Sequence, residues 1–158
     1  MYRAFVIALL FLCTVRDVSA EECDPARFDT LIRFEWRRSF DSAIDVCAGK
    51  RGDVVAIFVT RRARDGTVTL HRDRRLTVAD WAKLERTVAN AHLENVKPRT
   101  LEDMMRGCDG ATWTIRFDAG AVHRTAEQWA PDASAPTRIV GMAMLDLAGR
   151  DVIDGEVY

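Results

Sequence analysis

Hydrophobic and polar residues alternate along residues 32–40 with a period of two. One side of this segment carries the apolar residues Ile32, Phe34, Trp36 and Phe40. The other side carries charged and hydroxyl side chains, and Arg38 interrupts the apolar side near its end. Because side chains alternate between the two faces of a strand, this pattern predicts a half-buried β-strand. A short strand is expected to follow around residues 43–47.

Two more strands and a tight turn are predicted in residues 54–71. The run 54–60 is apolar on both faces, which is typical of a strand in the interior of a sheet. Residues 67–71 alternate again, with Val68 and Leu70 on one face. Asp65-Gly66 lies between these runs, and this dipeptide between strand-like segments predicts a β-hairpin.

Helical spacing first appears after Thr77. The apolar positions Trp81, Leu84, Val88 and Ala91 recur every three or four residues, with Leu93 near the end. Thr77 and Asp80 resemble a capping box, which starts a helix. Pro98 is expected to end any helix that precedes it. One further helical turn is expected around residues 101–105.

A second hairpin and a last helix are predicted after residue 110. Residues 112–117 alternate, Asp118-Ala119-Gly120 makes the turn, and residues 122–129 return as a strand. Trp113 should anchor the core, and Trp129 should meet it across the hairpin. Pro136 opens the last helix, which Gly149 stops. Its apolar stripe consists of Ile139, Met142, Leu145 and Ala148. The tail to Tyr158 is expected to add a short edge strand.

The order of strands, helix, strands and helix predicts an α+β fold. The sheet should be mostly antiparallel, with about five to six strands and two main helices packed on one face.

Residues 1–20 have the order of a secretory signal peptide. One positive charge, Arg3, precedes an apolar run over residues 4–15, and small residues end the segment at Val18-Ser19-Ala20. The alternatives are a membrane anchor and a buried first helix, but a spanning helix needs roughly 20 apolar residues. We therefore expect a cleaved signal at 1–20 and a single domain over 21–158, periplasmic or secreted and without stable membrane insertion.

Three cysteines follow the predicted signal, and an oxidising compartment favours a disulfide bond between two of them. Cys47 and Cys108 are the preferred pair, because each lies beside a predicted strand. Cys23 is the alternative partner, since such a bond would hold the amino-terminal segment. The spacing leaves these pairings open.

The charges are balanced overall, with a formal net charge of −1, but arginines concentrate on one predicted hairpin. The basic residues there are Arg61, Arg62, Arg64, Arg72, Arg74 and Arg75. A coherent patch of this kind would bind an anion or an acidic protein partner. The alternative is a solvated hairpin end that resists aggregation. Nucleic acid is not expected as a partner outside the cytoplasm.

No motif names a reaction. The weak catalytic candidates are Cys108 beside Asp109, with His123 one hairpin away, as a thiolate–imidazolium pair. A disulfide or a buried thiol is the competing interpretation of Cys108. The histidines lack metal-binding spacing, so no metal is expected, and no cofactor motif occurs. Paired carboxylates near the second hairpin are a further candidate: Asp109, Asp118 and Glu127.

A set of short motifs resembles a group of small exported bacterial proteins of unassigned function. The motifs are Asp109-Gly110-Ala111-Thr112-Trp113, then Gly120 with His123, then Trp129-Ala130-Pro131, preceded by a helix with an early tryptophan, Trp81. Two positions depart from the pattern: Val122 replaces an aromatic residue, and Ala130 replaces a small polar one. The resemblance spans roughly residues 75–150 and implies an exported α+β domain, with no catalytic residue carried over.

These observations favour a non-enzymatic binding domain of the bacterial envelope. Its most concrete form is an inhibitor or immunity protein that blocks an incoming toxin or a wall-degrading enzyme. One alternative is a small exported hydrolase that uses Cys108 and His123. Another is an envelope structural or assembly accessory protein.

Overall fold

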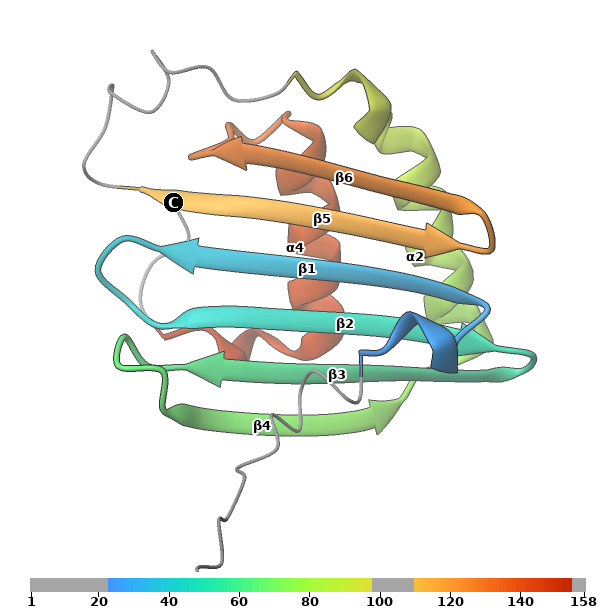
Figure 1. The fold of residues 1–158 in the computed structure, drawn as a ribbon, viewed down its shortest axis with the longest axis horizontal. Coiled ribbons are helices and arrows are strands. Elements are labelled where there is room, and N and C mark those ends of the chain that lie inside the picture. The colour runs from blue at the N-terminus through green and yellow to red at the C-terminus, as the bar shows by residue number, and fades with distance from the viewer. Residues whose placement is uncertain (1–22, 98–109, 155–158) are drawn as a thin grey trace, which may run out of the picture.

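An antiparallel sheet forms one layer of the fold, and helices form the other (Figure 1). The computed structural model describes residues 23–97 and 110–154. Within them the sheet has six strands in the order β4-β3-β2-β1-β5-β6. The strands are β1 (Thr30–Arg38), β2 (Ala43–Arg51), β3 (Val54–Arg62), β4 (Val68–Arg75), β5 (Ala111–Ala119) and β6 (Val122–Trp129). The predicted α+β class and antiparallel sheet are confirmed.

The chain builds this sheet outward in both directions from β1. Strands β1 to β4 form a meander, and the helix α2 (Val78–Ala91) follows it. The β5–β6 hairpin then pairs along the other edge of β1, and the helix α4 (Pro136–Ala148) completes the helical layer. Three short 3₁₀ turns complete the described elements: η1 (Pro25–Arg27), η2 (Leu93–Asn95) and η3 (Arg150–Val152). The strand expected in the tail is not found up to residue 154, where η3 takes its place.

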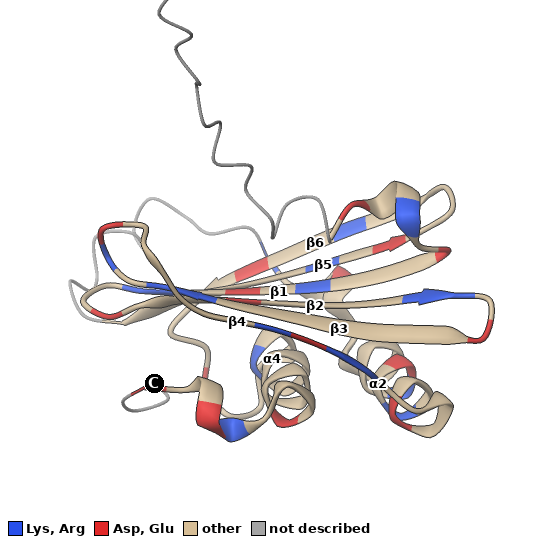
Figure 2. Ribbon diagram, turned by 90° about the horizontal axis from the view of Figure 1, so that it is seen from below, with Lys and Arg blue, Asp and Glu red and all other residues tan. Residues whose placement is uncertain are grey.

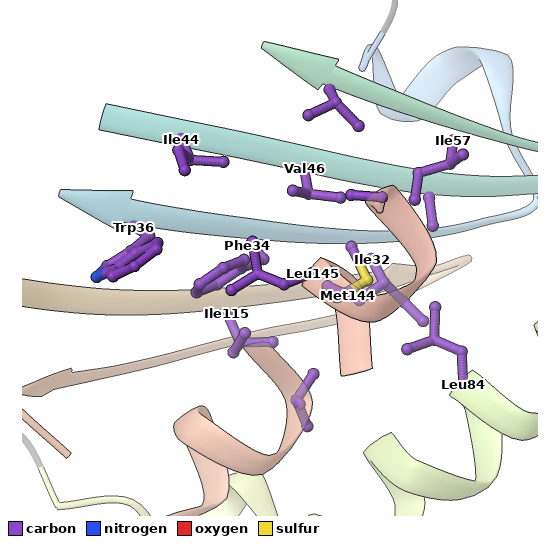
Figure 3. Packing of buried hydrophobic residues seen from close by; sticks show 14 of the residues in the cluster. Ile32, Phe34, Trp36, Ile44, Val46, Ile57, Leu84, Ile115, Met144 and Leu145 are labelled. Atoms are coloured by element: carbon purple, nitrogen blue, oxygen red, sulfur yellow. The ribbon is translucent and has the colours of Figure 1, made fainter. Parts of the chain in front are cut away.

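The main core lies between the sheet and the two helices (Figure 3). The apolar residues Ile32, Phe34 and Trp36 of β1 are fully buried there, as their alternation predicts, and three aromatic rings pack against one another in tilted orientations. Trp113 lies 5.2 Å from Phe34 and 5.3 Å from Trp36 between ring centroids. The prediction for Phe40 is wrong: this side chain is 60% exposed, because β1 ends two residues earlier.

The helix α4 buries Leu145 and Ala148 of the predicted stripe, but the first part of its buried side differs from the prediction. Ile139 is 41% exposed, whereas Val140, Gly141 and Met144 are buried. The physical reason is Gly141: a Cβ atom there would lie 2.6 Å from Cε3 of Trp113. The helix therefore approaches the sheet most closely at a residue without a side chain, and a stripe drawn through large apolar residues misses that position.

The second hairpin corrects the predicted role of Trp129. The turn lies at residues 120–121, slightly later than expected, and Trp129 is paired with Thr112 across the strands. Neighbouring positions on a strand point to opposite faces, so Trp129 does not meet Trp113. Its indole lies instead against Gly110, where a Cβ atom would be 2.8 Å from Cζ2. The glycine of the Asp-Gly-x-x-Trp motif thus makes room for an aromatic ring.

The helix α2 begins as the sequence predicts. The Thr77 hydroxyl accepts a hydrogen bond from the Asp80 amide at 3.0 Å, and the Asp80 carboxylate accepts one from the Thr77 amide at 3.2 Å. The helix ends at His92, whose backbone is left-handed. The helical turn predicted around residues 101–105 lies outside the described residues. Neither described helix has the length and apolar character that crossing a membrane requires.

Candidate binding surface on the open sheet face

Both helices lie on the same side of the sheet, so its other face is open across most of the described strands (Figure 2). Of the described elements outside the sheet, only the η1 turn lies against this face, over one end of β2 (Figure 1). An antiparallel sheet commonly leaves one face to solvent, and that face then carries polar residues. Here charged residues pair across β2, β1 and β5, and Figure 2 marks charged positions along the strands in blue and red.

The centre of the open face is a group of five charged side chains, which we call the acid–arginine cluster. Its members are Arg33, Glu35, Arg37, Asp45 and Arg116. Positions 33, 35 and 37 share one face of β1 because side chains repeat every second residue. The register places Arg116 of β5 opposite Arg33 and Asp45 of β2 opposite Glu35. Three strands therefore bring the cluster together.

Glu35 is the buried anchor of this cluster. Its side chain is only 6% exposed, although it lies on the open face. The carboxylate is 3.1 Å from Nη2 of Arg37, 3.3 Å from Nη2 of Arg116 and 3.5 Å from Nε of Arg33. A buried carboxylate needs charged or hydrogen-bonding partners, and these three guanidinium groups supply them.

Asp45 is the member of the cluster whose charge is in the least favourable surroundings. It lies directly opposite Glu35, and like charges in that position repel each other. Burial raises the pKa of Asp45, the nearby charge of Arg33 opposes this shift, and Glu35 adds to it. Nη2 of Arg33 is 3.9 Å from Asp45, so one guanidinium group bridges the two acids.

A row of polar side chains extends the cluster toward both edges of the sheet. Thr60 is paired with Asp45 and Thr114 with Glu35, and both threonines are buried. The Thr114 hydroxyl donates to Glu127 at 3.4 Å, and Thr60 is 3.4 Å from Nδ1 of His71. The open face therefore has a continuous polar strip from β4 to β6.

The three arginines of the cluster are held in place yet reach solvent. Their side chains are 72% exposed for Arg37, 45% for Arg116 and 27% for Arg33. A guanidinium group has five N–H donors, and one carboxylate cannot satisfy all those of three arginines. The remaining donors can bind carboxylates of another molecule in the two-pronged geometry that arginine favours.

The arginines predicted as one basic patch are divided between two faces by strand alternation. Arg61, Arg72 and Arg74 point to the helical side, where they hold the end of α4 and the η3 turn. Nη2 of Arg72 is 2.7 Å from Asp151, Arg74 donates to the Leu147 carbonyl, and Arg61 donates to the Val152 carbonyl at 3.4 Å. Arg62 and Arg75 lie on the open face, and Arg64 is exposed in the turn. The six arginines therefore do not form a single patch.

The weak catalytic candidates are only partly described. His123 is exposed, and its Nδ1 lies 2.6 Å from Oδ1 of Asp118. Cys108 and Asp109 lie outside the described residues, but Gly110 and His123 are at opposite ends of the β5–β6 hairpin. Glu127 lies toward the middle of the hairpin beside Thr114, away from Asp118. No group of acidic, histidine or cysteine side chains in the described residues is arranged to hold a metal ion.

Two cysteines meet beneath the η1 turn. Cys23 and Cys47 are buried in one small cluster, and a side-chain hydrogen bond joins them. This bond and burial raise the pKa of the Cys47 thiol, so it stays protonated and is a poor nucleophile. The predicted Cys47–Cys108 bond involves a residue outside the described part of the chain and stays a prediction.

A separate cavity of about 600 Å³ lies on the helical side. The end of α2, the η2 turn and the β5–β6 hairpin line it. Its apolar lining includes Val88, Leu93, Phe117 and Val122. An ion pair of 3.5 Å between Arg124 and Glu94 borders it. The size suits a small ligand.

The acid–arginine cluster was missed by motif-based reasoning, although its signal is in the sequence. Arg33, Glu35 and Arg37 alternate on the polar side of a predicted strand, a spacing that puts an acid between two bases on one face. Comparison with known proteins supplies no further guide to the site. No protein-family model matches the chain, and neither a curated protein nor a solved structure matches it.

Proposed function

We propose that this protein is an exported, non-enzymatic binding domain of the bacterial envelope that contacts an acidic region of a protein partner. The observation that supports this proposal is the convergence of three arginines on the buried Glu35 carboxylate. Two of them, Arg37 and Arg116, keep much of their surface in solvent. The contact surface is the acid–arginine cluster on the open sheet face.

The fixed position of these arginines is what suits them to binding. A long side chain normally loses rotamer freedom when it enters an interface, and that loss weakens association. Glu35 already restrains the guanidinium groups, so less freedom remains to be lost. Arginine is also enriched among the residues that contribute most to protein interfaces.

An inhibitor or immunity protein is the most concrete form of this proposal, with a toxin or a wall-degrading enzyme as the partner. An envelope structural or assembly factor is the alternative within the same binding class. The described residues give a hydrolase no support, because Gly110, two residues after Cys108, lies a full strand away from His123. At about 3.3 Å per residue, the strand from Gly110 to Asp118 spans roughly 26 Å.

The proposal is tested with a pair of matched double variants. Mature protein is immobilised and used to capture partners from envelope extract, and the affinity of any partner is then measured. Arg37→Gln with Arg116→Gln neutralises two charges on the open face and keeps an amide near Glu35. Arg64→Gln with Arg86→Gln removes the same charge from exposed positions elsewhere.

We expect the first variant to weaken binding by about tenfold or more, and the control to bind like the wild type. Binding should also weaken as salt rises, because partly exposed charges are screened. Equal capture by both double variants, in folded proteins with matching circular dichroism, would show that the open face is not the contact surface. Failure to recover any partner at near-endogenous levels would count against a binding function.

A further inference from the structure

A second, smaller apolar cluster lies on the otherwise polar open face. Cys23, Leu31 and Cys47 are buried in it, and Phe28 and Phe58 pack against them. Cys23 and Phe28 flank the η1 turn, and β1, β2 and β3 supply Leu31, Cys47 and Phe58. The cluster is small, so its apolar area alone is a weak anchor for the amino-terminal segment.

Local contacts hold the η1 turn down onto the sheet. Asp24 caps the turn through a 2.9 Å hydrogen bond from the Ala26 amide. The Asp29 amide donates to the Lys50 carbonyl at 2.8 Å, and the Asp29 carboxylate accepts from the Gly52 amide at 2.8 Å. These bonds tie the end of the turn to the β2–β3 hairpin.

Gly49 lets the turn come close enough to bury a thiol. A Cβ atom at this position would overlap Cδ1 of Phe28, because it would lie closer than van der Waals contact allows. The Phe28 ring therefore lies directly on the backbone of β2, and its centroid is 6.1 Å from that of Phe58. Cys23, at the start of this segment, is thereby placed against Cys47.

We propose that Cys23 and Cys47 form a disulfide bond in the exported protein. Both side chains lie in the same small buried cluster, where a hydrogen bond already joins them. The inference rests on the export part of the proposed function and is independent of the binding surface.

The reaction is an exchange with a disulfide of an extracytoplasmic thiol oxidoreductase. One cysteine thiolate attacks that disulfide and forms a mixed disulfide, and the second thiolate then displaces the oxidoreductase. Two S–H bonds are lost, one S–S bond forms between Cys23 and Cys47, and two electrons and two protons pass to the oxidoreductase as a dithiol. Because both thiols become buried, oxidation is expected before or during packing of the η1 turn.

The bond would secure one border of the acid–arginine cluster. Cys47 is paired with Arg33 across β2 and β1, so the link lies beside one of the cluster's arginines. It would close a loop that contains all of β1, one of the two central strands of the sheet. Restricting that loop in the unfolded chain stabilises the folded state.

Peptide mapping without reduction tests the pairing. The full chain with residues 1–20 is exported from a bacterium, alkylated under denaturing conditions and digested with trypsin. We expect residues 21–27 to be linked to residues 39–50, and the peptide 107–116, which holds Cys108, to carry the alkyl label. Cys108→Ser should leave the link intact. A link between 39–50 and 107–116, or separate labelled peptides for Cys23 and Cys47, would overturn the proposal.

A second measurement separates this proposal from the proposed function. Purified reduced protein is oxidised with oxidised glutathione, whatever its cellular location, and the same peptides are mapped. The Cys23–Cys47 link should form. The melting midpoint of the linked protein should exceed that of the Cys23→Ser protein by about 10 °C. Cys108→Ser serves as the matched control and should keep the high midpoint. Loss of partner capture would not alter this result, whereas mixed pairings with Cys108 would contradict it.

Discussion

Gly141 determines how closely α4 approaches the sheet. The rings of Trp113 and Phe34 occupy the space that its side chain would need, at 2.6 and 2.8 Å from a Cβ position. Trp113 also carries the cation–π contact of Arg138, whose Cζ is 5.3 Å from the ring centroid. Both aromatic rings are buried in the core, so neither can move aside without disturbing its neighbours.

We expect Gly141→Ala to destabilise the protein by about 1–3 kcal/mol, the usual cost of overpacking a core. The same change at an open helical site would stabilise by roughly 0.5–1 kcal/mol, so the sign of the effect is diagnostic. Urea unfolding measures the difference, with Ile139→Ala as the control on the exposed side of α4. A stabilised Gly141→Ala protein would mean that the helix can shift away from the sheet at little cost.

Single residues also show where sequence reasoning succeeds and where it stops. The alternation through Ile32, Phe34 and Trp36 was enough to find the buried face of β1, because each position contributes independently to the pattern. Arg38 looked like an interruption, yet its side chain is fully buried. Its Nε donates to the Ser42 carbonyl at 2.9 Å, and its guanidinium group lies 4.8 Å from the Trp36 ring centroid. Its guanidinium group also donates to the Asp154 carboxylate, 116 residues along the chain, and no local pattern reveals that partner.

At the scale of elements, the start of α2 is the feature that local sequence determines most directly. Thr77 and Asp80 exchange hydrogen bonds on an exposed turn, so their contribution depends little on the core. We expect Thr77→Ala to lower the free energy of unfolding by about 1 kcal/mol. Thr87→Ala, further along the same helix, should be neutral or slightly stabilising, because alanine favours helix interiors. Equal losses in both variants, measured by urea unfolding, would rule out the cap as the cause.

Strands and hairpins were predicted where turn residues separate alternating runs, and the β3–β4 hairpin follows that rule. The placement of the β5–β6 hairpin beside β1 does not follow from local sequence, because this pairing joins segments far apart in the chain. That pairing also creates the acid–arginine cluster by bringing Arg116 to Glu35. The part of the candidate surface that lies on β1 can therefore be predicted from the alternation of its residues. The residues that β2 and β5 contribute depend on the order of the strands in the sheet.

At the scale of the whole molecule, two aspartates give stability opposite dependences on pH. Burial raises the pKa of Asp45, although Arg33 opposes the shift, whereas the hydrogen bond and charge of Arg72 lower the pKa of Asp151. An acid with a raised pKa favours folding below its unfolded pKa, and this contribution is lost as the pH rises through the folded pKa. An acid with a lowered pKa favours folding above its unfolded pKa, and this contribution is lost as the pH falls through the folded pKa.

Asparagine at each position separates the two effects. Asp45→Asn should raise the melting midpoint at pH 7 by a few degrees, and the gain should shrink as the pH falls through the raised folded pKa of Asp45 toward the ordinary aspartate pKa of about 4. Asp151→Asn should lower the midpoint at pH 7, and this loss should shrink at lower pH, as the pH falls below the ordinary aspartate pKa of about 4 toward the lowered folded pKa of Asp151. Thermal unfolding followed by circular dichroism from pH 3 to pH 8 measures both. A lower midpoint for Asp45→Asn at pH 7 would mean that attraction to Arg33 outweighs burial. In that case Asp45 would serve as a second anchor of the arginines, beside Glu35.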